Sequence, residues 1–195
     1  MELLYSDKNI VVCIKPVGLD SEHQVPEKLS QLLGGEIFTL HRLDQNVGGV
    51  MVYARTKAAA AQFSRMIQEN QLVKEYVALV HGDVPAEGDW QDLLFKDSRK
   101  NKVFVVKRQR NGVKAARLEF RRLNDTSPAL VRVRLHTGRT HQIRVQFASR
   151  GFPLLGDRKY GAKDEYAAPM LYSCCLTFPY KEETKIFEHL PNWAK

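Results

Sequence analysis

Segments with strand and helix periodicity follow one another along this chain without regular alternation. Apolar, β-branched runs predict strands at 9–16, 50–54, 74–82, 129–138 and 170–178, with two more inside 103–123. Helical patterns lie at 26–33, 57–70 and 139–150. Because repeated strand–helix–strand units are missing, the pattern favours an α+β fold.

Turn and cap residues delimit several of these elements. Thr56 is the predicted N-cap of the second helix. Thr140 is the predicted N-cap of the third, and Gly151 follows its end. Gly48 and Gly49 predict irregular backbone before the strand at 50–54.

The composition is that of a globular protein. The 195 residues are 44% hydrophobic and 27% charged, so one compact domain spanning 1–195 is expected. No apolar run approaches the roughly 18 residues that a membrane span needs. The first residues, "MELLYSDKNIVV", lack a basic leader. We therefore expect a cytoplasmic protein, in which Cys13, Cys174 and Cys175 are buried thiols and no metal is bound.

Positive charge is concentrated in one segment. The formal net charge is +8, and residues 96–122 hold eleven Lys/Arg but only two Asp/Glu. Such clustering predicts a polyanionic partner, although a solvated face is the alternative. Asn111-Gly112 predicts a hairpin in this segment, with Lys107 and Arg108 on its basic surface. A membrane partner is not expected, because the segment contains no basic amphipathic helix.

One carboxylate stands out in the stretch "HRLDQNVGGVMVYA". Asp44 follows His41 and Arg42, and it lies on a predicted loop directly before an apolar strand. Loops held by a rigid scaffold commonly carry working side chains. In a dry pocket a carboxylate takes up a proton unless a cation or several donors stabilise its charge.

Four spaced motifs resemble the RluA family of pseudouridine synthases. They are "IKPVGL", "HRLD" with its glycine turn and strand, "KEYVALVHG" about 30 residues later, and "GRTHQIRVQFASRGFPLLGDRKYG". "LYSCCLTFPY" resembles the closing segment, so the likeness runs from Asn9 to Pro179. It implies one catalytic domain with a mixed, mostly antiparallel central sheet, flanking helices and an active-site cleft across the sheet. The S4-type RNA-binding domain of many relatives is not expected.

The resemblance implies isomerisation of uridine to pseudouridine in ribosomal or transfer RNA. Such enzymes break the C1′–N1 bond, rotate the bound uracil and join C5 to C1′. The chemistry needs a carboxylate but no cofactor, and by resemblance Asp44 is that carboxylate. Attack on C1′ and removal of the 2′ proton both stay open. We expect a monomer that acts on an RNA stem-loop.

The resemblance also implies roles for residues far from Asp44 in the sequence. Arg144 matches the arginine that pairs with the catalytic aspartate, and a guanidinium stays charged when buried. Tyr76 matches the active-site tyrosine, which stacks on uracil and helps to take the C5 proton. Arg42 is expected to help displace the target base.

Three further residues have two interpretations each. His41 is expected either to contact a backbone phosphate or to make a structural hydrogen bond. Arg139 and Thr140 are expected either to bind phosphate at the third helix's N-terminus or only to cap it.

Lys15 and Pro16 are expected to shape the first turn.

The chain departs from the family pattern Asp-x-x-Thr-Ser-Gly. Val47 and Gly48 replace the two hydroxyl residues, which we expect to brace the loop of Asp44. A catalytically impaired RNA-binding protein with the same fold is therefore one alternative. A nucleoside or glycoside hydrolase is another, and it requires a second acid such as Glu75.

Overall fold

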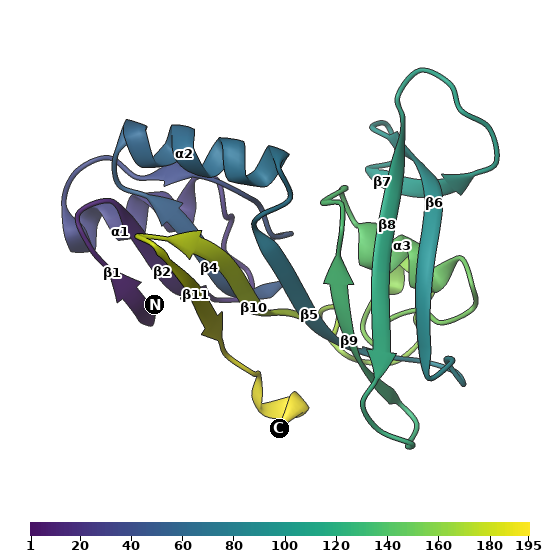
Figure 1. Ribbon diagram of the computed structural model, residues 1–195. Helices are drawn as coiled ribbons and strands as arrows, with labels where there is room; N and C mark the ends of the chain where they lie inside the picture. Colours follow the sequence, from purple (N-terminus) through teal and green to yellow (C-terminus); the bar gives the residue numbers. More distant parts are fainter. The chain divides into compact units, whose positions relative to one another are not determined.

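The computed structural model describes residues 1–195, which form two compact units (Figure 1). The terminal unit comprises residues 1–74 and 172–195, and the central unit comprises residues 75–171. None of the three α-helices has both the length and the apolar character that a membrane crossing requires.

A sheet forms the body of the terminal unit. Its strands follow the order β1-β2-β4-β10, with β3 paired to β4 and β11 paired to β10. The bounds are β1 Leu3–Ser6, β2 Ile10–Lys15, β3 Phe38–Thr39, β4 Gly48–Ala54, β10 Leu171–Tyr180 and β11 Glu183–Glu188. The β4–β10 pairing is parallel, whereas the others in this unit are antiparallel.

The close approach of β4 and β10 explains why residue 49 is a glycine. A Cβ atom at Gly49 would lie 2.3 Å from the carbonyl oxygen of Ser173, and the φ angle of Gly49 is +131°. Only glycine tolerates both conditions. The predicted irregular backbone at Gly48 and Gly49 is wrong in its extent, since both residues belong to β4, which is buried along its whole length.

Helices α1 (Gln24–Leu33) and α2 (Lys57–Gln68) belong to the terminal unit, with the short 3-10 helix η2 (Asn192–Ala194) near the C-terminus. The predicted cap of α2 is confirmed, because Thr56 Oγ1 accepts a hydrogen bond of 3.2 Å from the amide of Ala59. Phe63 lies in the buried apolar cluster, where its ring meets that of Phe178 edge-on at 5.0 Å. The apolar face of α2 thus covers the sheet.

The central unit contains a second group of strands, in the order β5-β9-β8-β6-β7. Their bounds are β5 Val73–Val80, β6 Glu87–Asp97, β7 Lys102–Val106, β8 Val113–Arg122 and β9 Ala129–Leu135. Helix α3 (Gln142–Ala148) buries Phe147 against Trp90 and Phe120, and the 3-10 helix η1 (Arg158–Tyr160) follows. With its sheet of mixed pairing and three helices, the chain has the expected α+β class.

The hairpin prediction at Asn111-Gly112 is wrong. Strand β6 lies between β7 and β8 and pairs with both: Leu94 is opposite Val105 on one side and Lys114 on the other. Residues 107–112 therefore connect two strands that are not neighbours. The Asn-Gly signal is local, and it holds no information about a third strand that enters between the two.

Helix α3 begins later than predicted. His141 precedes it with a left-handed φ of 51° and makes no side-chain cap, so Thr140 is not the N-cap. The Oε1 atom of Gln142 instead accepts the amide hydrogen of Arg139 at 3.0 Å. The amide of Gln142, which a Thr140 cap could have served, donates instead to the carbonyl of Arg139 at 3.1 Å.

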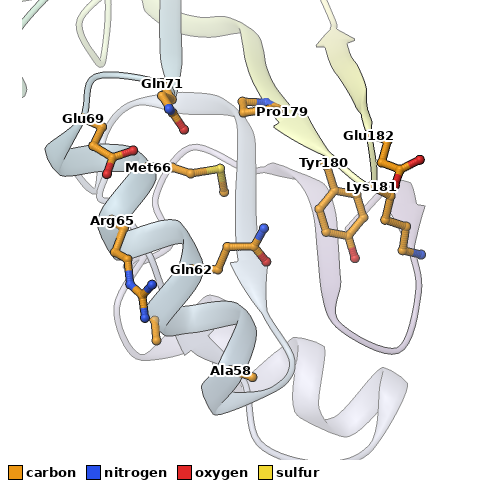
Figure 2. Close-up of a pocket in the computed structure, with 11 residues that line it drawn as sticks. Ala58, Gln62, Arg65, Met66, Glu69, Gln71, Pro179, Tyr180, Lys181 and Glu182 are labelled. Atoms are coloured by element: carbon orange, nitrogen blue, oxygen red, sulfur yellow. The ribbon is translucent and has the colours of Figure 1, made fainter.

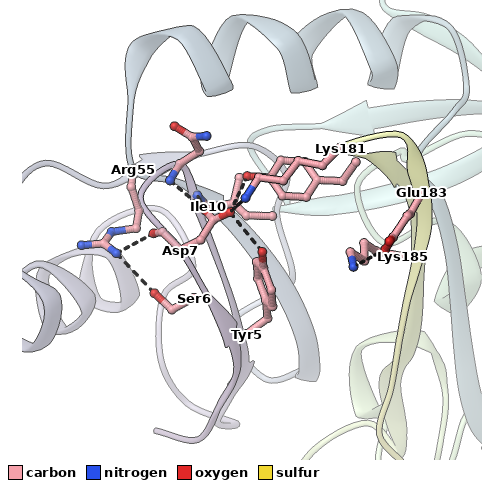
Figure 3. Close-up of polar contacts among 10 residues, drawn as sticks. Tyr5, Ser6, Asp7, Ile10, Arg55, Lys181, Glu183 and Lys185 are labelled. Atoms are coloured by element: carbon pink, nitrogen blue, oxygen red, sulfur yellow. Dashed lines mark hydrogen bonds and ion pairs between the residues drawn. The ribbon is translucent and has the colours of Figure 1, made fainter.

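Asp7 joins both ends of the terminal unit (Figure 3). Its carboxylate accepts hydrogen bonds from five donors, namely the amides of Asn9 and Ile10, the hydroxyls of Tyr5 and Tyr180, and Nζ of Lys181. Desolvation raises the pKa of this carboxyl, but the combined hydrogen bonds outweigh it and hold the pKa well below its usual range. The ionised form therefore stabilises the fold.

Replacing Asp7 with Asn should lower the free energy of unfolding at pH 7 by about 1–3 kcal/mol, because hydrogen bonds to a charge are lost. A depressed pKa contributes stability that is present above the unfolded value near 3.9 and lost as pH falls toward the folded value. The deficit of D7N should therefore shrink below about pH 4. Urea unfolding at pH 7 and pH 3, with D125N at an exposed site as control, measures this. If D7N lowers the free energy of unfolding equally at both pH values, the ionised carboxylate of Asp7 does not stabilise the fold.

Candidate active site

The loop that carries Asp44 is tied to the preceding turn from two directions. Ser21 Oγ donates to the carbonyl of Leu43 at 3.0 Å and lies 3.3 Å from its amide nitrogen. The amide of Gly18 donates to the carbonyl of Gln45 at 2.8 Å, and Gln45 Nε2 donates back to Gly18 at 3.0 Å. Asp44 itself is half-buried. These bonds fix the backbone on both sides of the carboxylate.

Lys15 is a further brace of this loop, and it is fully buried. Its Nζ donates to three carbonyl oxygens, of Leu19 at 2.7 Å, Pro16 at 3.0 Å and Gln45 at 3.1 Å. Burial lowers the pKa of Lys15 to about 8, while the carboxylates of Asp20 and Asp44 act in the opposite direction. The expected role in shaping the first turn is thus extended, because the ammonium also reaches the residue after Asp44.

His41 is buried and neutral. The amide of Val52 donates to its Nε2 at 3.2 Å, which places the ring proton on Nδ1. Burial, with a smaller contribution from Lys74, lowers the pKa of His41 to about 3. A neutral ring that accepts a backbone hydrogen bond favours the structural interpretation over a phosphate contact. Arg42, in contrast, is exposed and forms a 3.2 Å ion pair with Glu22.

The central unit carries the other predicted catalytic residues. Tyr76 is buried on β5. The neighbouring Glu75 is bound by Arg132, whose Nε and Nη2 lie 2.7 and 2.6 Å from Oε2. Glu75, the example given of the second acid that a hydrolase requires, is thus engaged in an ion pair.

Arg144 is the third residue of α3, and its side chain is almost fully buried. It forms a bidentate pair with Asp157: Nε lies 2.7 Å from Oδ2 and Nη2 lies 2.8 Å from Oδ1. Sequence reasoning missed Asp157, although the residue stands in the motif that ends "GDRKYG". The signal available in the sequence was an acidic residue directly after Gly156, 13 residues beyond Arg144.

The remaining predicted residues lie on the surface of the central unit. Lys107 and Arg108 are exposed in the 107–112 connection. Arg139 is exposed, and its Nε donates to the carbonyl of Ala115 at 2.9 Å. Because α3 begins at Gln142, Arg139 and Thr140 do not stand at a regular helix N-terminus.

The predicted site residues are divided between the two units. Asp44, His41 and Arg42 belong to the terminal unit, whereas Tyr76 and Arg144 belong to the central unit. The pairing of Asp44 with Arg144 stays a prediction.

A separate pocket of about 610 Å³ lies on the terminal unit, between α2 and the β10–β11 turn (Figure 2). Its lining includes Gln62, Arg65, Met66, Tyr180 and Lys181. None of the predicted site residues lines it.

Comparisons with known proteins bear on the family. Residues 9–149 match the family model described as RNA pseudouridylate synthase. The dual-specificity RNA pseudouridine synthase RluA of Yersinia pestis is 32% identical over 193 residues, covering 92% of this chain and 93% of that protein. An uncharacterized RNA pseudouridine synthase of Aquifex aeolicus is 33% identical over 190 residues. The match covers 89% of this chain but 60% of the Aquifex protein, so the chain spans less than two thirds of that relative.

Two solved structures have the same fold. Human RNA pseudouridylate synthase domain containing 4 superposes with a TM-score of 0.82 at 26% identity, covering 99% of this chain and 90% of the other. Human RNA pseudouridylate synthase domain containing 1 gives a TM-score of 0.85 at 24% identity, covering 97% and 83%. The family model, which matches well over half of the residues, and the full-length likeness to the Yersinia enzyme show that the chain belongs to the RNA pseudouridylate synthase family.

Proposed function

We propose that this chain isomerises uridine to pseudouridine in RNA with Asp44 as the catalytic carboxylate. The observation that carries the proposal is the bracing of the Asp44 loop by Lys15, Gly18 and Ser21. A reacting carboxylate must be held close to its productive geometry. These contacts supply the rigidity that the missing Thr and Ser hydroxyls would otherwise give, which favours an active enzyme over an impaired RNA-binding protein.

The reaction assigns one task to each residue. Asp44 either attacks C1′ or removes the 2′ proton, and the electron pair of the C1′–N1 bond passes to the uracil ring. The ring turns while bound, and C5 bonds to C1′ as the bond from Asp44 to C1′ breaks or, in the second route, as Asp44 returns the proton to C2′. The C5 proton then leaves with help from the Tyr76 oxygen. In the proposed site Arg144 pairs with Asp44 through its guanidinium.

The proposed substrate is a uridine in a stem-loop of ribosomal or transfer RNA. Relatives with 30% and 32% identity in Yersinia pestis are a ribosomal large subunit pseudouridine synthase D and the dual-specificity enzyme RluA. Extruding a base costs a few kcal/mol, and less in a loop than in a duplex. Arg42, exposed beside the Asp44 loop, is suited to occupy the space that the base leaves. We propose that the enzyme acts as a cytoplasmic monomer.

Substituting Asp44 with Asn should abolish tritium release from RNA that contains 5-tritiated uridine, a loss of about 10⁴-fold or more, because no other residue is proposed to attack C1′ or to remove the 2′ proton. RNA affinity should stay within a few-fold, and D125N should react like the wild type. An RNA-binding protein without activity would release no tritium even as wild type. A hydrolase would instead release free uracil.

Charge reversal at Lys107 and Arg108 should weaken RNA binding. K107E/R108E removes two exposed cations, so the slope of log affinity against log salt should fall by about 2 in magnitude. The matched control K28E/K57E makes the same change in net charge on exposed positions of α1 and α2. Binding titrations at several salt concentrations measure both variants. Equal weakening by the two would mean that net charge, rather than the 107–112 connection, governs binding.

Replacing Tyr76 with Phe should slow turnover by about 100-fold while RNA affinity stays unchanged, because the ring still stacks but the phenol oxygen is lost. Single-turnover rates and RNA titrations separate the two effects. Y166F, at an exposed tyrosine of the same unit, is the control. Equal rates for Y76F and wild type would exclude a role for the phenol oxygen.

A further inference from the structure

Strands β7, β6 and β8 of the central unit are neighbours in the sheet, and the helices of that unit pack on one face of them (Figure 1). On β6, the ring of Trp90 meets that of Phe147 of α3 at 4.7 Å, and Leu94 belongs to a buried cluster with residues of α3 and η1. Successive side chains of a strand point to opposite faces. Leu93 and Phe95 therefore point away from the helices, on what we call the open face.

Apolar side chains cover the open face at its β7 end. Paired residues of neighbouring strands present their side chains on the same face, so two apolar rows cross the three strands. The rows are Phe104, Phe95 and Val113, and Val106, Leu93 and Ala115. Both phenylalanines are only half-buried. We refer to these two rows as the platform; large apolar side chains gathered on an open face mark an interaction surface.

Cations lie directly against the two aromatic rings of the platform. The Cζ atom of Arg110 is 4.6 Å from the ring centroid of Phe95. The Nζ atoms of Lys100 and Lys102 are 5.9 and 5.8 Å from the ring centroid of Phe104. These distances are those of cation–π contacts. Each ring is thus flanked by at least one positive charge, and Lys100 and Arg110 are exposed.

The two acids among residues 96–122 are bonded to other groups. Asp97 Oδ1 accepts the amides of Arg99 and Lys100 at 3.0 and 3.2 Å, and Glu119 lies 3.0 Å from Nη2 of Arg117. The same segment holds eleven Lys/Arg. The surroundings of the platform are therefore strongly positive, and they complement a polyanion.

A single strand of nucleic acid matches both properties of this surface. Unpaired bases stack on aromatic side chains and on arginine, and the phosphates between them bind cations. Every base has a flat aromatic face, so such stacking needs no particular sequence. Aromatic side chains on the exposed face of a sheet are one established way in which proteins hold unpaired RNA.

We propose that the platform binds an unpaired segment of the RNA substrate, with bases stacked on Phe95 and Phe104 and phosphates held by Lys100, Lys102 and Arg110. The inference rests on the proposed action on RNA. It adds base contacts to the phosphate contacts expected of the 107–112 connection, and all of its residues belong to the central unit.

The first test is the variant Phe104→Leu, which keeps an apolar side chain on β7 but removes the aromatic face. Fluorescence anisotropy measures binding of a single-stranded oligouridylate of about ten nucleotides. F104L should weaken this binding by about tenfold, because a base loses its stacking partner. The slope of log affinity against log salt should stay as in the wild type, because no cation is removed.

An abasic oligomer of the same length separates stacking from charge. It carries the same phosphates but no bases, so the wild type and F104L should bind it equally. Both should bind it more weakly than the wild type binds oligouridylate. K107E/R108E, in contrast, should weaken binding of both oligomers, since it removes phosphate contacts.

The matched control is Phe187→Leu, the same substitution at a half-buried phenylalanine of β11 in the terminal unit. F187L should bind oligouridylate like the wild type. Phe104→Tyr keeps a ring at the platform and should bind within about twofold of the wild type. Circular dichroism checks that each variant is folded. Should F104L fail to fold, Phe95→Leu takes its place, with the same loss expected.

Equal oligouridylate affinity for the wild type and the folded leucine variant overturns the platform alone. So does an equal loss of affinity for the abasic oligomer, because the effect would then not depend on bases. Sedimentation without RNA tests a second copy of this chain as the occupant: a wild-type dimer that F104L dissociates, at unchanged RNA affinity, also overturns the proposal. Absence of tritium release from the wild type overturns the proposed isomerisation, whereas a base-dependent loss in F104L would still support the platform.

Discussion

The buried ammonium of Lys15 fixes the backbone next to Asp44. Removing a charged amine from water is costly, and the lowered pKa of Lys15 reflects that cost. Three carbonyl oxygens take up its three N–H donors, so the charge is solvated by backbone instead of water. Two of these oxygens belong to the turn after β2, and the third belongs to Gln45. A single side chain therefore joins the end of a core strand to the loop of the proposed catalytic residue.

The same physical solution appears around Arg144. There a buried guanidinium is solvated by one carboxylate and one aromatic face, and both partners come from the turn after α3. In each unit a buried cation is held by oxygen atoms that the backbone places rigidly. Such sites keep their geometry without reorganising when charge develops in a reaction, which is the property that electrostatic catalysis requires.

The sequence predicted those features that depend on local periodicity. The strands with apolar alternation and the Thr56 cap of α2 follow from short stretches of chain. What it failed to predict depends on distant segments. Strand β6 carries acids among its apolar residues and enters between β7 and β8, so the Asn111-Gly112 signal was misleading. Helix α3 starts after His141, whose backbone is left-handed, and the side chain of Gln142 folds back onto the amide of Arg139.

The candidate site likewise contains features that the sequence indicated and contacts that only the folded chain shows. The family resemblance singled out Asp44, Tyr76 and Arg144, and their joint role stays a prediction. The contacts of Lys15 were not predictable, since its acceptors are carbonyl oxygens, which every residue has. Asp157 was overlooked for a related reason: an acid in a turn is common, and only the folded chain shows that its carboxylate faces a buried arginine.

Formal charge is distributed unequally between the two units. Residues 75–171 contain nineteen Lys/Arg and eleven Asp/Glu, whereas the terminal unit contains eleven of each, so the whole formal charge of +8 resides in the central unit. Attraction to phosphate is screened by salt over about 8–10 Å and acts mainly on exposed cations. Lys15 is buried and is therefore screened much less than those exposed cations. Ionic strength should therefore act far more strongly on the proposed RNA binding than on the backbone contacts by which Lys15 holds the Asp44 loop.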